Sequence, residues 1–284
     1  MSGAVTDDPG IDGPGIDDRG IDDRGRDDRG TAVTVPSRVR RVVSLVPSLT
    51  EALEVSAPGL VVGATDWCSH PPSLAAARVG GTKNPDVDAV RALAPDLVVA
   101  NAEENRPPDL DALRAAGLAV WVTDVVTVPG ALRSLGRLLD ACRLDRPAWL
   151  DAAAAAWAAP TVLSPRRQAV VPIWRRPWMA LGRDTFAGDV LARLGVDNVL
   201  AGHAERYPRI DLAALPPYDL AVLPDEPYRF AADDGPQFFA PVPSALVSGR
   251  YLTWYGPSMV QAPAALHRAL LQALDEVPGT TPRG

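Results

Sequence analysis

Aromatic and charged residues gather in four short clusters of this sequence, and together they suit the binding of a large, flat ligand. The clusters are DWCSHPP at 66–72, NAEENR at 101–106, IWRRPWM at 173–179 and GRYLTWYG at 249–256. Aromatic faces supply apolar area for stacking, and arginine guanidinium groups donate directed hydrogen bonds to anionic groups. The chain has seven Trp although only 6% of its residues are aromatic. The clusters therefore predict a site for a flat, partly anionic ligand.

The candidate ligand-binding side chains are the aromatic, charged and amide groups of these clusters. They are Trp67, His70, Asn101, Glu103, Glu104, Trp174, Arg175, Arg176, Arg250, Trp254 and Tyr255. Several also have a purely structural interpretation. His70 precedes two prolines and is typical of a turn, while Glu103 and Glu104 suit a solvated loop. One of the two arginines of IWRRPWM fits a structural ion pair, and Trp178 is expected in the core in preference to Trp174.

The clusters follow short apolar runs that alternate with helical patterns along the chain. Strands are expected at 42–46, 60–64, 97–100, 120–123 and 170–173, and helices at 48–55, 86–93 and 108–116. Ser48, with Glu51 three residues later, has the pattern of a capping box at the start of the first helix. This alternation predicts mostly parallel sheets, whose ligands bind beyond the carboxyl ends of the strands.

Two stretches of the chain resemble each other, which indicates an internal duplication. NPDVDAVRALAPDLVVA at 84–100 matches YPRIDLAALPPYDLAVL at 207–223, and the segments 41–59 and 177–195 both read as strand, polar break and helix. A unit repeated once, with a helical stretch between the copies, predicts two similar α/β lobes facing a cleft. That stretch, 128–159, contains Pro147, which kinks the helix or starts a second one.

Length and composition divide the 284 residues into four parts. Residues 1–37 are predicted to be a disordered Gly/Asp/Arg-rich tail, because the isolated Ile residues of GIDGPGIDDRGIDDRGRDDRG cannot bury enough apolar surface. An N-terminal lobe at 38–127, a connecting helix region at 128–163 and a C-terminal lobe at 164–284 follow. The first thirty residues carry −5 of the net charge of −7. The remaining chain is nearly neutral, which argues against a nucleic-acid partner.

Location is predicted from the start of the chain. The first residues have neither the basic start nor the unbroken apolar run of a secretory signal. A cytoplasmic protein is therefore expected, or an extracytoplasmic one if the start site is misassigned. No stretch approaches the roughly 20 apolar residues of a membrane helix, so we do not expect a membrane-embedded protein. Cys68 and Cys142 are far apart and lack the spacing of a disulfide framework or metal site.

The order of these motifs resembles that of the helical-backbone metal receptors, which bind cobalamin, haem or ferric siderophores for ABC importers. The resemblance rests on VVSLVPSLTEAL, DWCSHPP, GGTKNPDVDAVRALAPDLVVAN, PWMALGRDTFAGDVLARLGVDNV, YPRIDLAAL and RYLTWYG. It covers nearly all of the chain from Arg38 to Ala273. It implies two similar Rossmann-like α/β lobes with mostly parallel sheets, joined by one long rigid backbone helix, which the 128–159 stretch would supply.

The resemblance also implies roles for single residues in ligand binding. Trp67 and Tyr207 fall where cobalamin binders present an aromatic side chain to the ligand. Arg250 and Trp254 fall in the second-lobe loop that reaches the ligand. Asn101 stands where cobalamin binders often use a further aromatic residue.

A permease partner is implied by a second feature of the family. Members coupled to a permease carry an exposed acidic residue on each lobe, which docks on arginines of that permease. Asp88 matches the first of these acids, and Asp211 lies two positions from the place of the second, Ala213.

The sequence thus predicts a substrate-binding protein that captures a corrinoid, haem or ferric chelate between two lobes, as for an ABC importer, with no intrinsic cofactor or metal site. One alternative is a cytosolic carrier or sensor of such a ligand that acts without a permease. Another is a hydrolase that uses Glu103 or Glu104 as general base together with Asp184. Because the sequence has no nucleophile elbow, phosphate loop or dinucleotide fingerprint, an enzyme is not expected.

Overall fold

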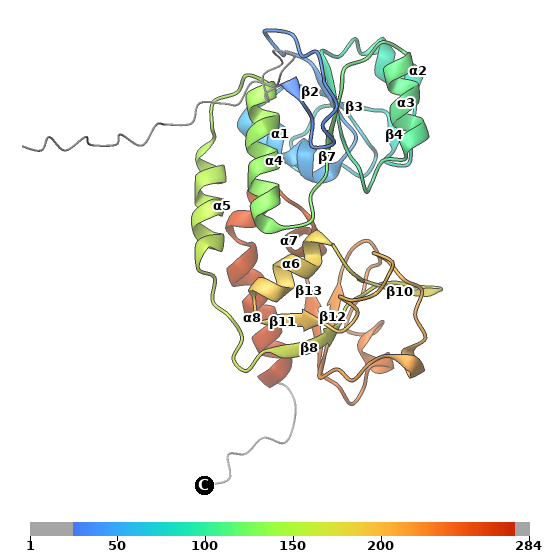
Figure 1. The fold of residues 1–284 in the computed structure, drawn as a ribbon, viewed down its shortest axis with the longest axis vertical. Helices are drawn as coiled ribbons and strands as arrows, with labels where there is room; N and C mark the ends of the chain where they lie inside the picture. The colour runs from blue at the N-terminus through green and yellow to red at the C-terminus, as the bar shows by residue number, and fades with distance from the viewer. Residues whose placement is uncertain (1–24, 276–284) are drawn as a thin grey trace, which may run out of the picture.

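Two parallel sheets form the centres of two α/β lobes in the computed structural model, which describes residues 25–275 (Figure 1). The first lobe contains β1 (Val42–Ser44), α1 (Pro47–Ser56), β2 (Val61–Ala64), β3 (Ala77–Arg78), β4 (Gly80–Gly81), β5 (Asn84–Pro85), α2 (Val87–Ala92), β6 (Leu97–Asn101), α3 (Pro107–Ala115) and β7 (Val120–Thr123). The second contains β8 (Arg167–Val170), β9 (Pro172–Arg175), β10 (Trp178–Ala180), α6 (Phe186–Arg193), β11 (Val196–Asn198), η2 (Leu212–Ala214), β12 (Leu220–Pro224), η3 (Pro236–Phe238), β13 (Ser244–Val247), α7 (Gly249–Thr253), η4 (Pro257–Val260) and α8 (Ala262–Asp275).

The two sheets repeat one topology, which confirms the predicted fold class. The first has the order β3-β2-β1-β6-β7 and the second the order β11-β8-β12-β13, and every pairing in both is parallel. The strands β6 and β12 are buried along their whole length, as expected for a parallel sheet covered on both faces. They occupy equivalent places, so the match between 84–100 and 207–223 reflects equivalent structure.

The other proposed match, between 41–59 and 177–195, is correct only for its helices. The strand β1 corresponds to β8, which pairs in parallel with β11 and β12. An antiparallel hairpin, β9–β10, is inserted between β8 and the helix α6. The segment beginning at Pro177 therefore contains a hairpin strand in place of the expected sheet strand, and the cluster IWRRPWM lies on this insertion.

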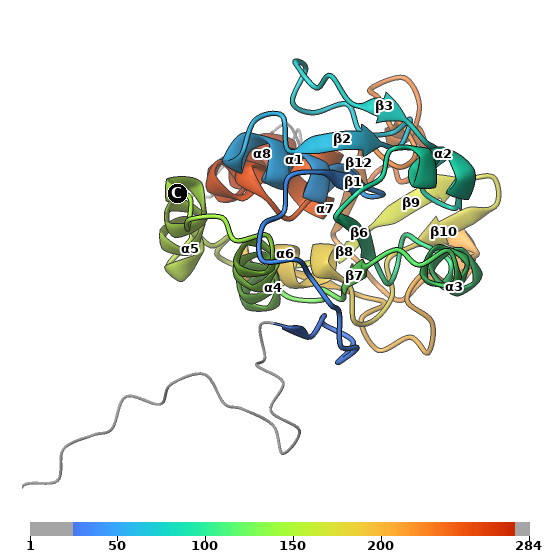
Figure 2. The same cartoon turned by 90° about the horizontal axis from the view of Figure 1, so that it is seen from above.

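Two helices connect the lobes in place of one continuous helix. The helix α4 (Val128–Ala141) lies along the first lobe, and α5 (Ala148–Ala158) runs down the side of the molecule toward β8 (Figures 1 and 2). Thr127 caps α4 by accepting a hydrogen bond from the Gly130 amide. The break contains Arg143 with a positive φ of 58° and ends at Pro147, the N-cap of α5. Pro147 lacks the amide hydrogen that an uninterrupted helix would need.

The start of α1 also differs from the expected capping box. Pro47 is the first helical residue, and the N-cap is Val46, which has no side-chain oxygen to offer. Proline suits this position because its missing amide hydrogen would be unpaired there in any case. Ser48 and Glu51 are buried instead of capping the helix, and Glu51 is therefore available for a contact with the second lobe.

The prediction of disorder for residues 1–37 is wrong for residues 25–37. The segment 25–33, called the strap below, lies against β7 and α4. Asp27 is only 1% exposed, and Val33 joins the main apolar core. The amide of Asp28 donates to the Val122 carbonyl at 3.1 Å. Side-chain contacts with backbone amides order this segment, and such contacts leave no apolar periodicity in the sequence. Residues 1–24 lie outside the described part of the chain.

The main apolar core continues from one lobe to the other. It joins residues of α1, β1 and β6 to residues of α4 and α5, and these to residues of β8, β12 and α8. Both cysteines are buried and free. Within residues 25–275, no helix is long and apolar enough to cross a membrane.

Candidate ligand site at the lobe interface

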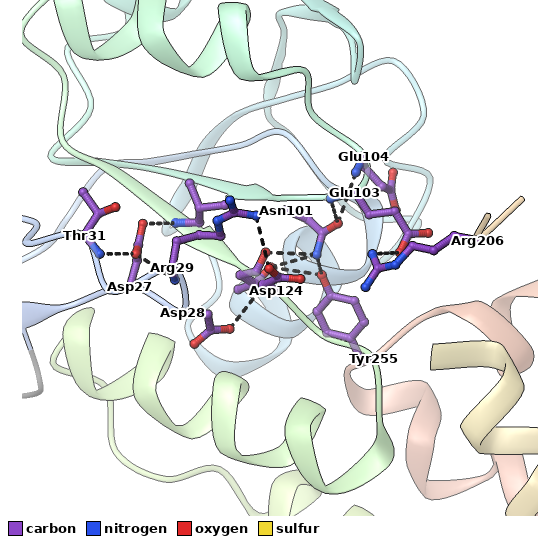
Figure 3. Close-up of polar contacts among 12 residues, drawn as sticks. Asp27, Asp28, Arg29, Thr31, Asn101, Glu103, Glu104, Asp124, Arg206 and Tyr255 are labelled. Atoms are coloured by element: carbon purple, nitrogen blue, oxygen red, sulfur yellow. Dashed lines mark hydrogen bonds and ion pairs between the residues drawn. The ribbon is translucent and has the colours of Figure 1, made fainter. Parts of the chain in front are cut away.

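The carboxyl ends of β6 and β7 meet the second lobe through a buried hydroxyl. Tyr255 follows α7 and is 5% exposed, and its hydroxyl accepts a hydrogen bond from Asn101 Nδ2 at 2.8 Å (Figure 3). The same hydroxyl lies 3.1 Å from Thr123 Oγ1. Burial raises the pKa of Tyr255 far above the usual range, so the hydroxyl stays protonated. Asn101 and Tyr255, both expected to contact a ligand, are buried here and hydrogen-bond to each other.

An ion pair between α1 and α7 is the second buried contact across the interface. Arg250 Nη2 donates to Glu51 Oε1, and the Glu51 side chain is 6% exposed. Arg250 also lies 5.8 Å from the centre of the Trp254 ring. The predicted role of Arg250, meeting an anionic group of the ligand, does not hold in this arrangement because a protein carboxylate occupies its guanidinium. These contacts of Glu51, Asn101, Thr123, Arg250 and Tyr255 are called the inner contacts below.

A more exposed set of contacts crosses the interface at Glu103. Its Oε1 accepts a hydrogen bond from the Tyr207 hydroxyl, and its Oε2 lies 3.4 Å from Arg206 Nη1. The side chains of Glu103 and Arg206 are 30% and 34% exposed. Burial raises the pKa of Glu103, while the positive charge of Arg206 acts in the opposite direction. Figure 3 shows this pair beside Asn101 and Tyr255.

Glu104 carries the most strongly perturbed carboxyl group of this region. Burial, together with the nearby negative charges of Glu103 and Glu226 and against the positive charge of Lys83, raises the pKa of Glu104 to about 7. Among the described residues, no side chain forms a hydrogen bond or ion pair with the Glu104 carboxylate. A carboxyl group that is partly protonated near neutral pH can both donate and accept a hydrogen bond.

Glu226 is the counterpart of Glu103 in the second lobe. Each lies two residues beyond the end of an equivalent strand, Glu103 after β6 and Glu226 after β12. Burial also raises the pKa of Glu226, and Trp254 Nε1 donates to its Oε2 at 3.3 Å. A Cβ atom at Gly249 would collide with the Glu226 side chain, so the chain needs glycine at the start of α7 to hold this carboxylate.

Aromatic side chains complete the exposed part of the interface. Trp67 follows β2 and is 69% exposed, the largest exposure of any large apolar side chain in residues 25–275. The ring of His70 meets the Trp254 ring edge-on, with 5.5 Å between the centroids. Trp254 itself is only 7% exposed. The outer group, as used below, consists of Trp67, His70, Glu103, Glu104, Arg206, Tyr207, Glu226 and Trp254.

The β9–β10 hairpin holds contacts of its own, and β10 also pairs with the segment that follows Tyr207. Trp174 is 42% exposed and packs edge-on against Tyr228. Arg175 forms an ion pair with Asp234, as expected for one arginine of this cluster. Arg176 is exposed, and its carbonyl accepts a hydrogen bond from Trp174 Nε1 at 3.2 Å. Trp178 packs with Phe230, Phe238 and Phe239.

The structure thus brings together only part of the predicted site. Contacts or charge interactions connect His70, Trp254, Glu104, Glu103 and Tyr207, directly or through Glu226. Trp67 lies at the same edge of the first sheet, whereas the hairpin carries Trp174, Arg175 and Arg176. Sequence reasoning missed Glu51, Arg206 and Glu226. For Glu226 a signal existed, because the repeat that aligns β6 with β12 also aligns Glu103 with Glu226.

The two acids expected to dock on a permease differ in their surroundings. Asp88, in the first turn of α2, is 92% exposed and pairs with Arg91. Asp211 is the N-cap of η2, where its carboxylate accepts a hydrogen bond from the Ala213 amide at 3.0 Å. In the first lobe the equivalent cap is Asp86. Asp211 thus shares the capping position of Asp86, whereas the repeat of 84–100 at 207–223 aligns Asp211 with Asp88.

Two further chemistries receive no support from the described residues. No group of three His, Cys, Asp or Glu side chains in residues 25–275 could hold a metal ion. Asp184, the proposed partner of a hydrolytic Glu103 or Glu104, is 61% exposed and pairs with Arg183. The helix that follows Asp184 is capped by Thr185.

Comparison with solved structures identifies the fold. The vitamin B12 binding protein BtuF of Vibrio cholerae is 18% identical, with a TM-score of 0.66, over 85% of this chain and all of that one. A periplasmic haem-binding protein of Pseudomonas aeruginosa is 25% identical, with a TM-score of 0.61, over 82% and 92%. CeuE of Helicobacter pylori, solved with Ni(II) bound, is 14% identical, with a TM-score of 0.71, over 88% and 89%.

The chain has the fold of the helical-backbone metal receptors. No family model and no curated protein matches its sequence, so the likeness is one of structure. The solved proteins that share this fold are described as binding proteins, which fits a binding protein better than an enzyme.

The comparisons also correct the predicted location. BtuF and HutB of Vibrio cholerae, RhuT of Roseiflexus and BhuT are all periplasmic proteins. They point to a place outside the cytoplasm, which contradicts the cytoplasmic location expected from the first residues of the chain.

Proposed function

We propose that this protein is a substrate-binding protein that holds a metal-containing complex between its lobes, as for an ABC importer. The single observation that carries the proposal is the outer group. Trp67 presents a largely exposed ring after β2, and Glu103 and Glu104 follow β6 at the same edge of the first sheet. The charge of a further acid, Glu226 of the second lobe, acts on Glu104. Exposed aromatic area next to partly buried polar groups is the combination expected of a ligand site.

The chemistry of the outer group favours a ligand rich in hydrogen-bond donors over an anionic one. Three carboxyl groups with raised pKa values converge there. Two of the three arginines considered for anionic groups are paired with carboxylates, Arg250 with Glu51 and Arg175 with Asp234, while Arg176 lies exposed on the hairpin. A corrinoid carries amide side chains, which a partly protonated carboxyl group can meet as donor or acceptor. The propionates of haem would add negative charge to an acidic site, at an energetic cost.

Ligand entry requires the outer contacts to open while the inner contacts hold the lobes together. The hydrogen bond from Tyr207 and the ion pair from Arg206 both end on Glu103. Breaking them costs little because exposed pairs contribute at most about 1 kcal/mol each. A ligand that inserts beside Trp67 replaces these contacts with its own.

Docking on a permease would use Asp88 on the first lobe. Asp88 is exposed and lies outside the ligand interface, as a docking residue must. Asp211 is the nearest acid on the second lobe, but its carboxylate already caps η2. We therefore expect Asp88 to contribute more than Asp211 to any such contact.

A tryptophan-quenching and absorbance titration tests the proposal. The panel contains cyanocobalamin, cobinamide, haemin and a set of ferric siderophores, each added to the purified chain. Saturable quenching at micromolar or lower concentration is expected for a corrinoid, with weaker binding of haemin. Flat titrations over the whole panel would contradict the proposed function.

A further inference from the structure

The strap is held like a bound peptide in a preformed cradle on the first lobe. Asp28 Oδ2 accepts hydrogen bonds from Ser134 Oγ at 2.5 Å and from the Asp124 amide at 3.0 Å. Its Oδ1 accepts one from Arg137 Nη1 at 3.1 Å. The Asp28 side chain is 9% exposed, so this carboxylate is nearly buried and has several donors. Such charge-assisted bonds are among the stronger ones in proteins.

The other residues of the strap complete a turn that fits the same cradle. Asp27 Oδ1 accepts hydrogen bonds from the amides of Arg29 and Thr31, at 3.0 and 2.8 Å. Arg29 pairs with Asp124 at 3.3 Å. Gly30 has a φ of +76°, a conformation that glycine adopts without strain. Each residue of Asp-Asp-Arg-Gly therefore has a separate function in the contact, as Figure 3 shows for its first three.

The sequence contains this tetrapeptide three times. DDRG occupies positions 17–20, 22–25 and 27–30, with one residue between successive copies. Only the last copy lies wholly within the described residues. The cradle is formed by Val122, Asp124, Ser134 and Arg137, and its hydrogen bonds to the strap, 25–33, reach outside the tetrapeptide only at the backbone carbonyl of Arg26, a group that the residue before each copy also has. We propose that the cradle is a recognition site for Asp-Asp-Arg-Gly and that the upstream copies are alternative occupants of it.

Contacts outside the tetrapeptide favour the copy at 27–30. Residues Arg26 and Ala32 form an isolated antiparallel bridge, and the Val33 amide donates to the Gly25 carbonyl at 2.7 Å. When an upstream copy docks, the chain between the cradle and Val33 gains at least five residues and loses these bonds. Lengthening a loop by a few residues costs little, so the upstream copies remain competent occupants with lower affinity.

A pocket beside the strap leaves space for such an exchange. It has a volume of about 530 Å³ and lies between the strap and α4. Arg133, on its wall, is exposed and forms no ion pair with any residue of 25–275. A second acidic tetrapeptide can therefore approach before the first one leaves.

Amide hydrogen exchange at Asp124 reports occupancy directly, because this amide donates to the docked carboxylate. Three full-length variants are compared with the natural chain. In the first, Asp27 and Asp28 become Ala. In the second, the four Asp residues at 17, 18, 22 and 23 become Ala. In the third, all six are replaced. The Leu45 amide, which donates to Val99 inside the sheet, serves as a control for global unfolding.

The proposal predicts that the first variant keeps the protection of the Asp124 amide within about threefold, because an upstream copy replaces the lost one. The second variant behaves like the natural chain. The third loses at least about tenfold protection at Asp124 while Leu45 is unchanged. A synthetic GIDDRGR peptide restores the protection, and its Asp-to-Asn version does not. Equal loss of protection in the first and third variants, or failure of the peptide, would overturn the proposal.

Discussion

The inner and outer contacts cross the same interface, but they differ in how deeply their polar groups are buried. Asn101, Thr123 and Tyr255 are buried and hydrogen-bond one another, and Glu51 is paired with Arg250, although Glu51 Oε2 and Arg250 Nε are buried without a hydrogen-bond partner. The outer group combines an exposed ring, Trp67, with three acids whose pKa values are raised. The difference indicates that the inner contacts hold the lobes together, whereas the outer group is a surface prepared for another molecule.

Removing Arg250 gives the sharpest test of the inner contacts. The substitution Arg250→Ala leaves Glu51 as a buried unpaired carboxylate, which is expected to cost about 3 kcal/mol of unfolding free energy. Urea denaturation measures this loss. The exposed pair of Arg146 with Asp151 is the matched control, and Arg146→Ala is expected to cost less than about 0.5 kcal/mol. Equal losses of unfolding free energy in the two variants would mean that the buried pair contributes no more to stability than an exposed pair does.

The inner contacts and the outer group each contain one tyrosine, so the same substitution, Tyr to Phe, can be made in both. Tyr255→Phe removes the shortest of the hydrogen bonds that the buried Asn101 Nδ2 donates, leaving the longer ones to Thr123, and is expected to destabilise the fold by about 1–2 kcal/mol. Tyr207→Phe removes a hydroxyl from the outer group, and the expected loss is below about 0.5 kcal/mol because water replaces it. Thermal and urea unfolding compare the two. A larger loss for Tyr207 than for Tyr255 would reverse the assignment of inner and outer contacts.

The sequence was sufficient for the main parallel strands of the first lobe and for β12, because buried runs such as those of β6 and β12 are local features. The strand expected at 170–173 instead divides between β8 and the antiparallel hairpin strand β9. The sequence was insufficient for contacts between residues far apart in the chain. Nothing near Tyr255 indicates a bond to Asn101, and nothing near Arg250 indicates Glu51. The strap was missed for a different reason, since Asp27 and Asp28 order it through polar contacts that resemble a charged disordered tail in composition.

Replacing Glu104 is expected to change the unfolding free energy by a smaller amount, and this change should depend on pH. The pKa of Glu104 is raised to about 7, so folding disfavours the charged form, and stability falls as the pH rises from about 4.5 to 7. Glu104→Gln removes this penalty. A full shift of that size corresponds to about 3 kcal/mol, and partial hydration of the side chain lowers the expected gain to about 1–2 kcal/mol at pH 8.

The gain should vanish near pH 4, where both the folded and unfolded forms hold the proton. Urea denaturation at pH 4 and pH 8 measures the difference, with the exposed Glu205→Gln as control. A gain of equal size at both pH values would show that it comes from packing and not from the charge.

Ligand titration of Trp67→Ala tests the central claim, that the outer group binds the ligand, most directly. The variant is compared with the natural chain and with Trp149→Phe, a change on α5 at a ring that bonds to Ser56. The account predicts at least about tenfold weaker corrinoid binding for Trp67→Ala, through lost stacking, with unfolding free energy unchanged within about 0.5 kcal/mol. Trp149→Phe should bind as the natural chain does. Unchanged corrinoid affinity in Trp67→Ala would contradict the claim.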